Sequence, residues 1–450
     1  MTILSKDSKN LLIFSFPLIF GGLLKSSVYF LFALFLAHVS ADALASGALA
    51  STFFVTFNII IFGTLSSINI LVAHLYGAAD NKSISLVLRD GFLIAFAVTI
   101  PSFIFFWYSS SILLFFGQNK DLTEMSESYF HALSWGILPN LITMVILEFM
   151  IGIGHTRVFL IFSFFNVLTI ILFGFCLIFG KYGFPCLGVS GAGWGTTIGY
   201  WITAIFLIYY FFMNNKYRQY SCTVISIKKT SFIFNLLQLG IPMGIMYFVE
   251  MGFFYALILI VGSISVELLA ANQIVLQYVW LQIPVMLAIA QAITVLMGHA
   301  LGRGDRVAAM NTYHAGAFIS ICFMLLVGLI YSLFPEALIA LDFDINNPAN
   351  QKLIQLAIQL FAVCALFQLA MSARVSLFGA LRAFHDTRFT LYVSIISLWG
   401  IALPLGYLMA VHFNLGGVGL WLGISFGMGS SVLLLFWRLK LKIRTYASPT

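Results

Sequence analysis

The chain has 450 residues, of which 61% are hydrophobic and 8% charged, with a formal net charge of +7 and a mean hydropathy of +1.04. Soluble globular domains carry about 25% charged residues, so this composition excludes an ordinary soluble core. The five cysteines are scattered without Cys-x-x-Cys or Cys/His spacing, so we predict small core residues and no metal site.

Long apolar segments recur along the whole chain. A bilayer span needs roughly 20 apolar residues, and a spanning backbone must bond internally, so each segment predicts a helix. An outer-membrane barrel would show short alternating strands instead. The first segment has no small-residue cleavage site and is predicted to be retained. The expected all-α fold has spans at residues 11–36, 48–72, 91–117, 128–153, 158–180, 187–213, 232–262, 272–299, 314–341, 353–379, 389–412 and 417–437.

The basic residues lie on one side of the predicted spans. With a cytoplasmic N-terminus, only Lys120, Lys181 and Lys352 among the basic residues between spans fall outside the cell. The positive-inside rule therefore predicts an even number of spans and two cytoplasmic termini in a bacterial inner membrane. The positive net charge reflects this topology and contact with the lipid bilayer, and it predicts no nucleic-acid partner.

The chain contains an internal repeat. An offset of 225 residues aligns Pro17 with Pro242 and the segment 73–80 with 298–305, which share His, Gly and Asp at identical spacing. Because an even number of spans separates equivalent positions, the two halves have the same orientation in the membrane. Two such six-helix lobes suit alternating access to a site between them, whereas a channel filter or a ring of like charges is not apparent.

The repeat predicts a domain organisation in two lobes. The N-lobe covers residues 1–213 and carries the first six spans. The C-lobe covers residues 232–450 and carries the last six. The polar segment 214–231 is predicted to be a cytoplasmic linker.

Four ionisable residues stand out well inside predicted spans, where a charge costs several kcal/mol and therefore suggests a function. Lys25 and Glu250 occupy equivalent positions in the repeat, and they are predicted to face a common cleft as the cation-coupling site. A carboxyl group in such surroundings can titrate in the physiological range. The alternative is a static buried ion pair. Glu148 and Arg374 lie nearer the cytoplasmic ends of their spans and fit either transport or a packing contact.

The eighth predicted span carries a polar stripe. Gln273, Gln277 and Trp280 share one helical face, which must point to the protein interior in a lipid environment. Hydrogen bonding between helices is the alternative use of these side chains. The predicted substrate-binding set is Glu250, Asn272, Gln273, Gln277, Tyr278, Trp280, Phe367, Gln368 and Met371.

Two further motifs are interpreted as structural. The segments 74–80 and 299–305 place a Gly where a helix can end and an Asp where the next helix can be capped. The small residues of the segment 188–195 allow helices to approach closely, and no strand precedes them, so they form no nucleotide-binding loop.

These features together resemble the multidrug and toxic compound extrusion (MATE) family, in its NorM-like branch. The resemblance covers nearly the whole chain and is carried by Pro17, Pro242 and the segments 191–195, 270–273, 298–302, 379–382 and 386–388. It implies a twelve-helix antiporter, predicted to be monomeric, that exports cationic drugs or metabolites. The inward movement of protons or sodium ions would drive export, with no further cofactor, and Glu250 would correspond to the acidic residue of the seventh helix.

Two acidic residues that the resemblance leads us to expect are replaced. The Asp of the first helix falls on Phe32 and that of the tenth on Met371, while a nearby Tyr is replaced by Phe367. A sodium ion needs several oxygen ligands and a proton needs one carboxylate, so the replacements favour proton coupling.

Two other functions were compared with export. A lipid or lipid-linked-sugar flippase is the nearest alternative, and it should have a broadly basic cavity. A membrane enzyme is disfavoured because His131 and His155 have no acidic or nucleophilic partner nearby in sequence.

Overall fold

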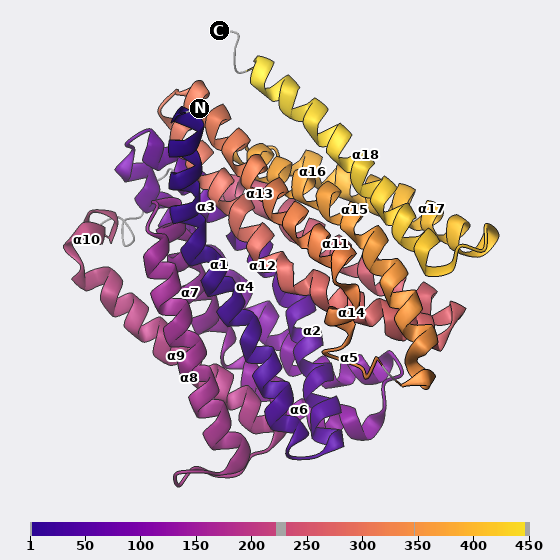
Figure 1. Cartoon of the computed structure of the whole chain (residues 1–450). Helices are drawn as coiled ribbons and strands as arrows, with labels where there is room; N and C mark the ends of the chain where they lie inside the picture. The colour runs from indigo at the N-terminus through magenta and orange to yellow at the C-terminus, as the bar shows by residue number, and fades with distance from the viewer. Residues whose placement is uncertain (1, 222–230, 346, 446–450) are drawn as a thin grey trace. The chain divides into compact units, whose positions relative to one another are not determined.

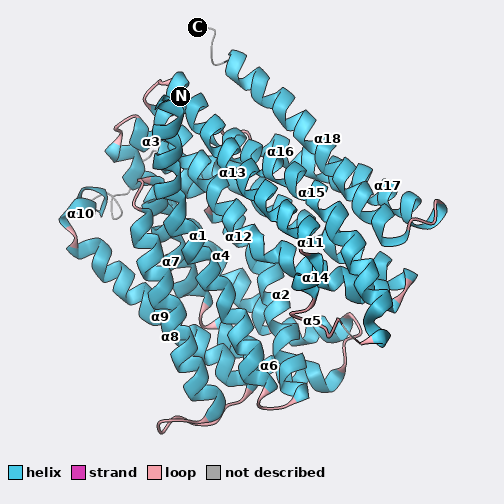
Figure 2. Ribbon diagram, viewed as in Figure 1, coloured by secondary structure: helices cyan, strands magenta, loops and turns pink. Residues whose placement is uncertain are grey.

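The protein is described by a computed structural model that covers residues 2–221, 231–345 and 347–445. Within these ranges the chain is helical and contains no strand (Figure 2). The contacts divide it into two compact units, which we name the N unit (residues 16–241) and the C unit (residues 1–15 and 242–450). The boundaries fall next to Pro17 and Pro242, each of which lies inside a helix.

The N unit is built from the first ten helices and the start of α11 (Figure 1). The helices are α1 (Thr2–Ala37), α2 (Ala41–Leu65), α3 (Ser67–Gly77), α4 (Asn81–Trp107), α5 (Ser109–Phe115), α6 (Lys120–Ser134), α7 (Ile137–Gly152), α8 (Thr156–Phe179), α9 (Val189–Met213) and α10 (Asn215–Ser221).

The C unit contains the remaining helices and the first residues of α1. Two of its segments, η2 and η3, are π-helical, and η1 is a single 3₁₀ turn. The elements are α11 (Ile233–Ile264), α12 (Val266–Gly302), α13 (Arg306–Leu333), α14 (Pro335–Ile339), η1 (Pro348–Asn350), α15 (Gln351–Ala383), α16 (Thr387–Ser394), η2 (Ile395–Ala402), α17 (Leu403–Tyr407), η3 (Leu408–His412) and α18 (Gly416–Thr445).

The predicted number of spans is confirmed. Eleven helices of the described chain are long and apolar enough to cross a membrane, and the bent pair α6 and α7, which meet at 51°, makes a twelfth if it is counted as one span. The predicted second span, 48–72, extends from Ala41 to Gly77 and is broken at Ser66. Hydropathy marks only the apolar centre of a helix, whereas the helix continues into its polar ends.

The predicted lobe boundaries stay a prediction. The predicted linker 214–231 contains the short helix α10, which packs on α4 and α9 of the N unit. Its residues 222–230 lie outside the described part of the chain.

The structural interpretation of the His-to-Asp motifs is confirmed. Helices α3 and α12 end inside them, and an aspartate then caps the helix that follows. The Asp80 carboxylate accepts a hydrogen bond from the Ser83 backbone N–H at 3.1 Å, and Asp305 accepts one from the Ala308 N–H at 2.9 Å. Such a cap satisfies a donor that the first turn of a helix leaves without a partner.

Glycine allows the closest helix contacts at equivalent places in both units. A Cβ atom on Gly195 of α9 would collide with the backbone of Gly174 on α8, and one on Gly423 of α18 would collide with the backbone of Gly406 on α17. Helices in lipid associate through such close packing, because lipid tails give apolar side chains little reason to leave them. The small-residue segment of the sequence therefore packs helices, as predicted.

We expect Gly423→Ala to lower the free energy of unfolding by about 1–3 kcal/mol, because the new methyl group meets backbone that cannot move aside. Gly429→Ala is the matched control, since it lies in the same helix and a Cβ there meets nothing within 4 Å. Thermal unfolding of the purified protein in detergent measures both. Equal stability of the two variants would contradict the close contact.

Removal of the Asp80 cap should have a pH-dependent effect. Hydrogen bonds from the side chain and backbone of Ser83 lower the pKa of the Asp80 carboxyl below its ordinary value of 3.8. The ionised Asp80 carboxylate therefore stabilises the fold above pH 3.8, and this stabilisation is lost as the pH falls through the lowered pKa. We expect Asp80→Ala to cost about 1 kcal/mol at pH 7. In unfolding measurements, the difference in stability between Asp80→Ala and wild type should shrink as the pH falls below 3.8. A difference that stays constant with pH would contradict this role of the Asp80 carboxylate.

Candidate functional site

A buried ion pair lies at the centre of the C unit. Glu250 on α11 and Arg374 on α15 are joined by a hydrogen bond of 2.5 Å between the carboxylate Oε1 and the guanidinium Nη2. The Arg374 side chain is 1% exposed and that of Glu250 is 18% exposed. Removing such charges from water carries a large penalty, which close pairing offsets.

Two serines complete the surroundings of the guanidinium. Arg374 also donates to the Ser394 hydroxyl at 2.8 Å and to the Ser431 hydroxyl at 3.0 Å, and Ser394 donates to the same Glu250 oxygen at 3.1 Å. The ring of Phe378 lies under the guanidinium at 4.4 Å. One arginine thus connects α11, α16 and α18 to α15, so a change in the charge of Glu250 would act on four elements together.

The site adjoins an irregular stretch of helix. Ser394 is the last residue of α16, and the π-helical segment η2 begins at the next residue. Within η2, the Trp399 indole donates to the backbone carbonyl of Val249, the neighbour of Glu250, at 3.2 Å. Isolated π-helical turns are frequent at functional sites. The irregular segment therefore contacts the helix that carries the acidic residue.

A second cationic contact lies one turn from Glu250. Arg382 on α15 donates to the Tyr247 hydroxyl at 3.0 Å, and its guanidinium lies over the Tyr247 ring at 5.4 Å. Arg382 is buried. This face of α11 is therefore held to α15 at two successive turns.

The predicted substrate residues divide between the core and the surface of the C unit. Asn272, Phe367 and Gln368 are buried; the Asn272 amide oxygen accepts a hydrogen bond from the Trp421 indole at 3.0 Å, and the Phe367 ring packs on the Trp421 ring. Gln368 donates to the sulfur of Cys364 at 3.8 Å. The contacts of Asn272 and Phe367 with Trp421 join α12 and α15 to α18, whereas that of Gln368 stays within α15. The predicted role of the three residues in binding stays a prediction.

The remaining members of that set lie further out. Gln273, Gln277 and Trp280 share one face of α12, as their spacing predicts, but all three are exposed, which contradicts the expectation that this face points to the protein interior. Tyr278 donates from its hydroxyl to the Leu338 carbonyl at 2.8 Å. Met371 packs, partly buried, against apolar core residues. Their role in binding also stays a prediction.

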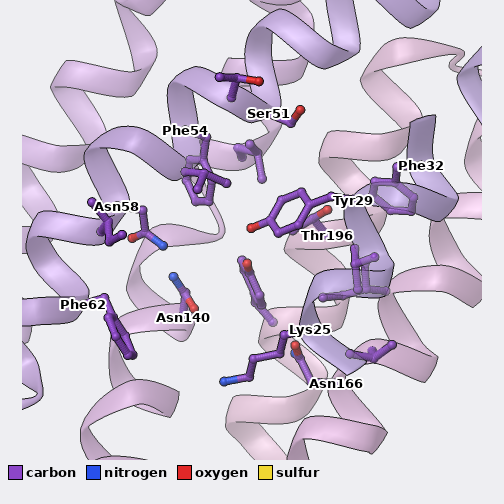
Figure 3. Close-up of a pocket in the computed structure, with 18 of the residues that line it drawn as sticks. Lys25, Tyr29, Phe32, Ser51, Phe54, Asn58, Phe62, Asn140, Asn166 and Thr196 are labelled. Atoms are coloured by element: carbon purple, nitrogen blue, oxygen red, sulfur yellow. The ribbon is translucent and has the colours of Figure 1, made fainter. Parts of the chain in front are cut away.

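The N unit contains a cavity of about 350 Å³ between its helices (Figure 3). Its lining comes from α1, α2, α6, α7, α8 and α9 and includes Tyr29, Asn58, Asn140 and Asn166. Lys25 is the one residue with a formal charge among those that line it. Clefts of this size, with mostly apolar walls and a few polar groups, are typical small-molecule sites.

Lys25 has a carboxylate of its own unit in its surroundings. It experiences the charge of Glu148 on α7, and its ammonium lies 4.7 Å from the centre of the Phe159 ring. Glu148 is buried and accepts a hydrogen bond from the Asn69 amide at 2.5 Å. Glu250 is thus in direct contact with an opposite charge of its own unit, whereas Lys25 senses the charge of Glu148 without an ion pair among the described residues.

Two features of the site were missed in the sequence. The first is the pairing of Arg374 with Glu250. Its signal in the sequence is that the predicted spans contain two prominent acids and two prominent bases, because charges inside a membrane tend to pair. The second is the cavity of the N unit. Its signal was the recurrence of amide side chains in the charge-free spans of the first half, such as Asn58, Asn140 and Asn166.

Repeated bundles of membrane-spanning helices with a polar cavity and a buried ion pair define a membrane transporter. The sequence model of the MatE family matches the chain twice, at residues 17–176 and 242–408. The two matches begin at the two prolines that the internal repeat aligns. The chain therefore belongs to the MatE family, which confirms the resemblance seen in the sequence, and it is a transporter and not an enzyme.

Relatives of similar length carry related names. The chain is 30% identical over 422 residues to a probable multidrug resistance protein NorM of Brucella suis, covering 93% of this chain and 90% of the relative. It is 33% identical over 408 residues to the multidrug resistance protein NorM of Burkholderia vietnamiensis, with coverage of 90% and 88%.

Solved structures share the fold. A variant of the Vibrio cholerae MATE transporter VcmN superposes with a TM-score of 0.88 at 16% identity over 100% of both chains. The eukaryotic MATE transporter AtDTX14 superposes with a TM-score of 0.83 at 19% identity over 99% of both chains. The predicted all-helical fold of two related halves is confirmed.

Neutralising one member of the ion pair should destabilise the protein. We expect Glu250→Gln to lower the free energy of unfolding by about 3–5 kcal/mol, because it leaves the Arg374 cation buried without a counter-charge. The double variant Glu250→Gln with Arg374→Gln should recover a large part of that loss. Chemical denaturation in detergent micelles measures the three proteins.

An exposed ion pair in the same unit is the control. Lys352 and Glu267 lie 3.1 Å apart with side chains 70% and 47% exposed. Lys352→Gln should change stability by less than about 1 kcal/mol, since water already solvates both charges. If Glu250→Gln with Arg374→Gln is no more stable than Glu250→Gln alone, the uncompensated charge of Arg374 is not the cause of the lost stability.

Proposed function

We propose that this protein is a secondary antiporter that exports small organic compounds in exchange for the inward movement of a cation, with the proton favoured over sodium. The observation that carries the proposal is the ion pair of Glu250 with Arg374. A buried, partly accessible carboxylate that holds four elements through one guanidinium is a group whose protonation would alter helix packing. Such a group can couple ion binding to a conformational change.

The contacts of Glu250 favour a proton over a sodium ion. One oxygen of the carboxylate is already bound by Arg374 and Ser394. A sodium ion needs several oxygen ligands, and it would be repelled by a guanidinium in direct contact with the same carboxylate. A proton needs a single oxygen, and once bound it removes the charge that attracts Arg374. Protonation from outside would then release the guanidinium and the helices that it holds.

The class of cargo follows in part from the relatives. Those of Brucella suis and Burkholderia vietnamiensis are named multidrug resistance proteins, so we propose small, chemically varied organic compounds as cargo. A cationic cargo, which the resemblance implies, needs a free carboxylate as counter-charge. Glu250 would provide one only after Arg374 has moved away. A flippase is less well supported, because its expected broadly basic cavity contrasts with the single basic residue that lines the N-unit cavity.

The proposed location is a bacterial inner membrane with both termini in the cytoplasm. The distribution of Lys and Arg between the spans supports this orientation. The relatives named above are bacterial. We propose that the protein acts as a monomer, with the lipid bilayer and the small-molecule cargo as its partners.

Transport into everted membrane vesicles tests the coupling. Uptake of ethidium and of naphthoate, an organic cation and an organic anion, is measured under an imposed proton gradient and separately under a sodium gradient. We expect the proton gradient to drive uptake of at least one compound in the wild type. Glu250→Gln should abolish this uptake, because its side chain no longer binds and releases a proton.

Two further variants secure the interpretation. The double variant Glu250→Gln with Arg374→Gln is expected to fold and still lack gradient-driven uptake. Glu336→Gln changes an exposed carboxylate on α14 and should transport like wild type. Unchanged gradient-driven uptake in Glu250→Gln would remove this residue from coupling, and uptake driven only by sodium would refute the proton.

A further inference from the structure

The cavity of the N unit has a single formal charge, and that charge is positive. Lys25 is accessible from the cavity, and the other lining residues are neutral polar or apolar. In Figure 3 the side chains of Lys25, Tyr29, Asn58 and Asn140 surround the same open space. A ligand in this space therefore meets an ammonium group and amide and hydroxyl groups, with no carboxylate in the lining.

The Lys25 ammonium has no ion pair with any residue of the described chain within 4.0 Å. Its close contact is the Phe159 ring at 4.7 Å, whose attraction for a cation is weak compared with that of a carboxylate. Glu148 is the acid that influences it, and the carboxylate of Glu148 is bound to the Asn69 amide. The ammonium is thus left able to bind an additional anion from the cavity.

Two hydroxyl groups beside the cavity have no hydrogen-bond partner within the described residues. They belong to Thr143 on α7 and Ser163 on α8, both of which line the cavity and are buried at 8% and 0% exposure. Buried polar groups without a partner are rare, because each carries a desolvation penalty. The cavity wall therefore includes two buried hydroxyls without a hydrogen-bond partner among the described residues.

The walls and the size of the cavity restrict the rest of the ligand. Aromatic side chains contribute much of the lining, among them Tyr29, Phe54, Phe62 and Phe162. Aromatic rings bury flat apolar groups effectively and stack with them. A volume of about 350 Å³ suits a compound of one or two rings with a polar end.

We propose that the N-unit cavity binds aromatic organic anions, with the carboxylate of the cargo paired to Lys25 and its rings among the aromatic walls. This inference rests on the proposed export function and specifies the charge of its cargo. It makes Lys25 a residue that determines specificity, and the cargo it selects differs from the cationic class that the resemblance implies.

Equilibrium dialysis with the purified full-length protein in nanodiscs tests this proposal. Three naphthalene probes differ only in charge: naphthoate is an anion, naphthamide is neutral and naphthylmethylammonium is a cation. The wild type should bind naphthoate most tightly. Lys25→Gln should weaken naphthoate binding by about tenfold or more, the usual effect of losing a hydrogen-bonded charge, and leave naphthamide binding unchanged.

Two lysine variants serve as controls. Lys25→Arg keeps the positive charge and should retain the preference for naphthoate. Lys120→Gln removes an exposed lysine of α6, whose side chain is 75% exposed, and should bind all three probes like wild type. If Lys25→Gln fails to fold, as shown by its thermal unfolding, the three-probe comparison in wild type and in Lys25→Arg still decides the matter.

The outcomes separate this inference from the proposed function. Binding of naphthoate no tighter than naphthamide, tightest binding of the cation, or unchanged binding in folded Lys25→Gln would each overturn the anion site. Glu336→Gln, which changes an exposed carboxylate on α14 of the C unit, should leave naphthoate binding intact. Naphthoate binding without any gradient-driven transport would instead refute the proposed antiporter function. Transport of ethidium without naphthoate binding would refute only the anion site.

Discussion

The central constraint on this molecule is that a charge placed inside a bilayer must find a partner. Arg374 is more deeply buried than Arg382 of the same helix, and its guanidinium is bound by Glu250, Ser394 and Ser431 together. Because these residues come from four different elements, the packing of that unit depends on one carboxylate keeping its charge. A buried pair of this kind contributes little net stability compared with apolar packing. Under the proposed function, a single proton bound to Glu250 would switch the arrangement.

The two units share a fold and carry charges of opposite sign at equivalent positions. Lys25 on α1 and Glu250 on α11 occupy equivalent positions in the repeat, and each is accompanied by a residue of the other sign, Glu148 on α7 and Arg374 on α15. In the C unit the pair is in direct contact. In the N unit the base faces a cavity and the acid is bound elsewhere. Under the two proposals above, the C unit would bind the coupling ion and the N unit would bind the cargo.

The sequence was sufficient for the architecture and insufficient for the pairing of side chains. Hydropathy locates the spans, and the alignment of Pro17 with Pro242 defines the repeat, because both depend on residue type and spacing alone. Which charges meet depends on the rotation of each helix about its axis, and no spacing encodes this rotation. For that reason the sequence does not predict that Arg374 lies beside Glu250. The same rotation buries Asn272 and leaves Gln273 exposed.

The paired glycines have a mechanical consequence. Where Gly195 meets Gly174 and Gly423 meets Gly406, backbone lies directly against backbone, with no side chains between them to slide or change rotamer. Helices joined in this way move as one block, so the bending that alternating access requires must be absorbed at other joints. Gly406 itself belongs to the interrupted helix of residues 387–412, which is therefore carried along with α18 as part of one such block.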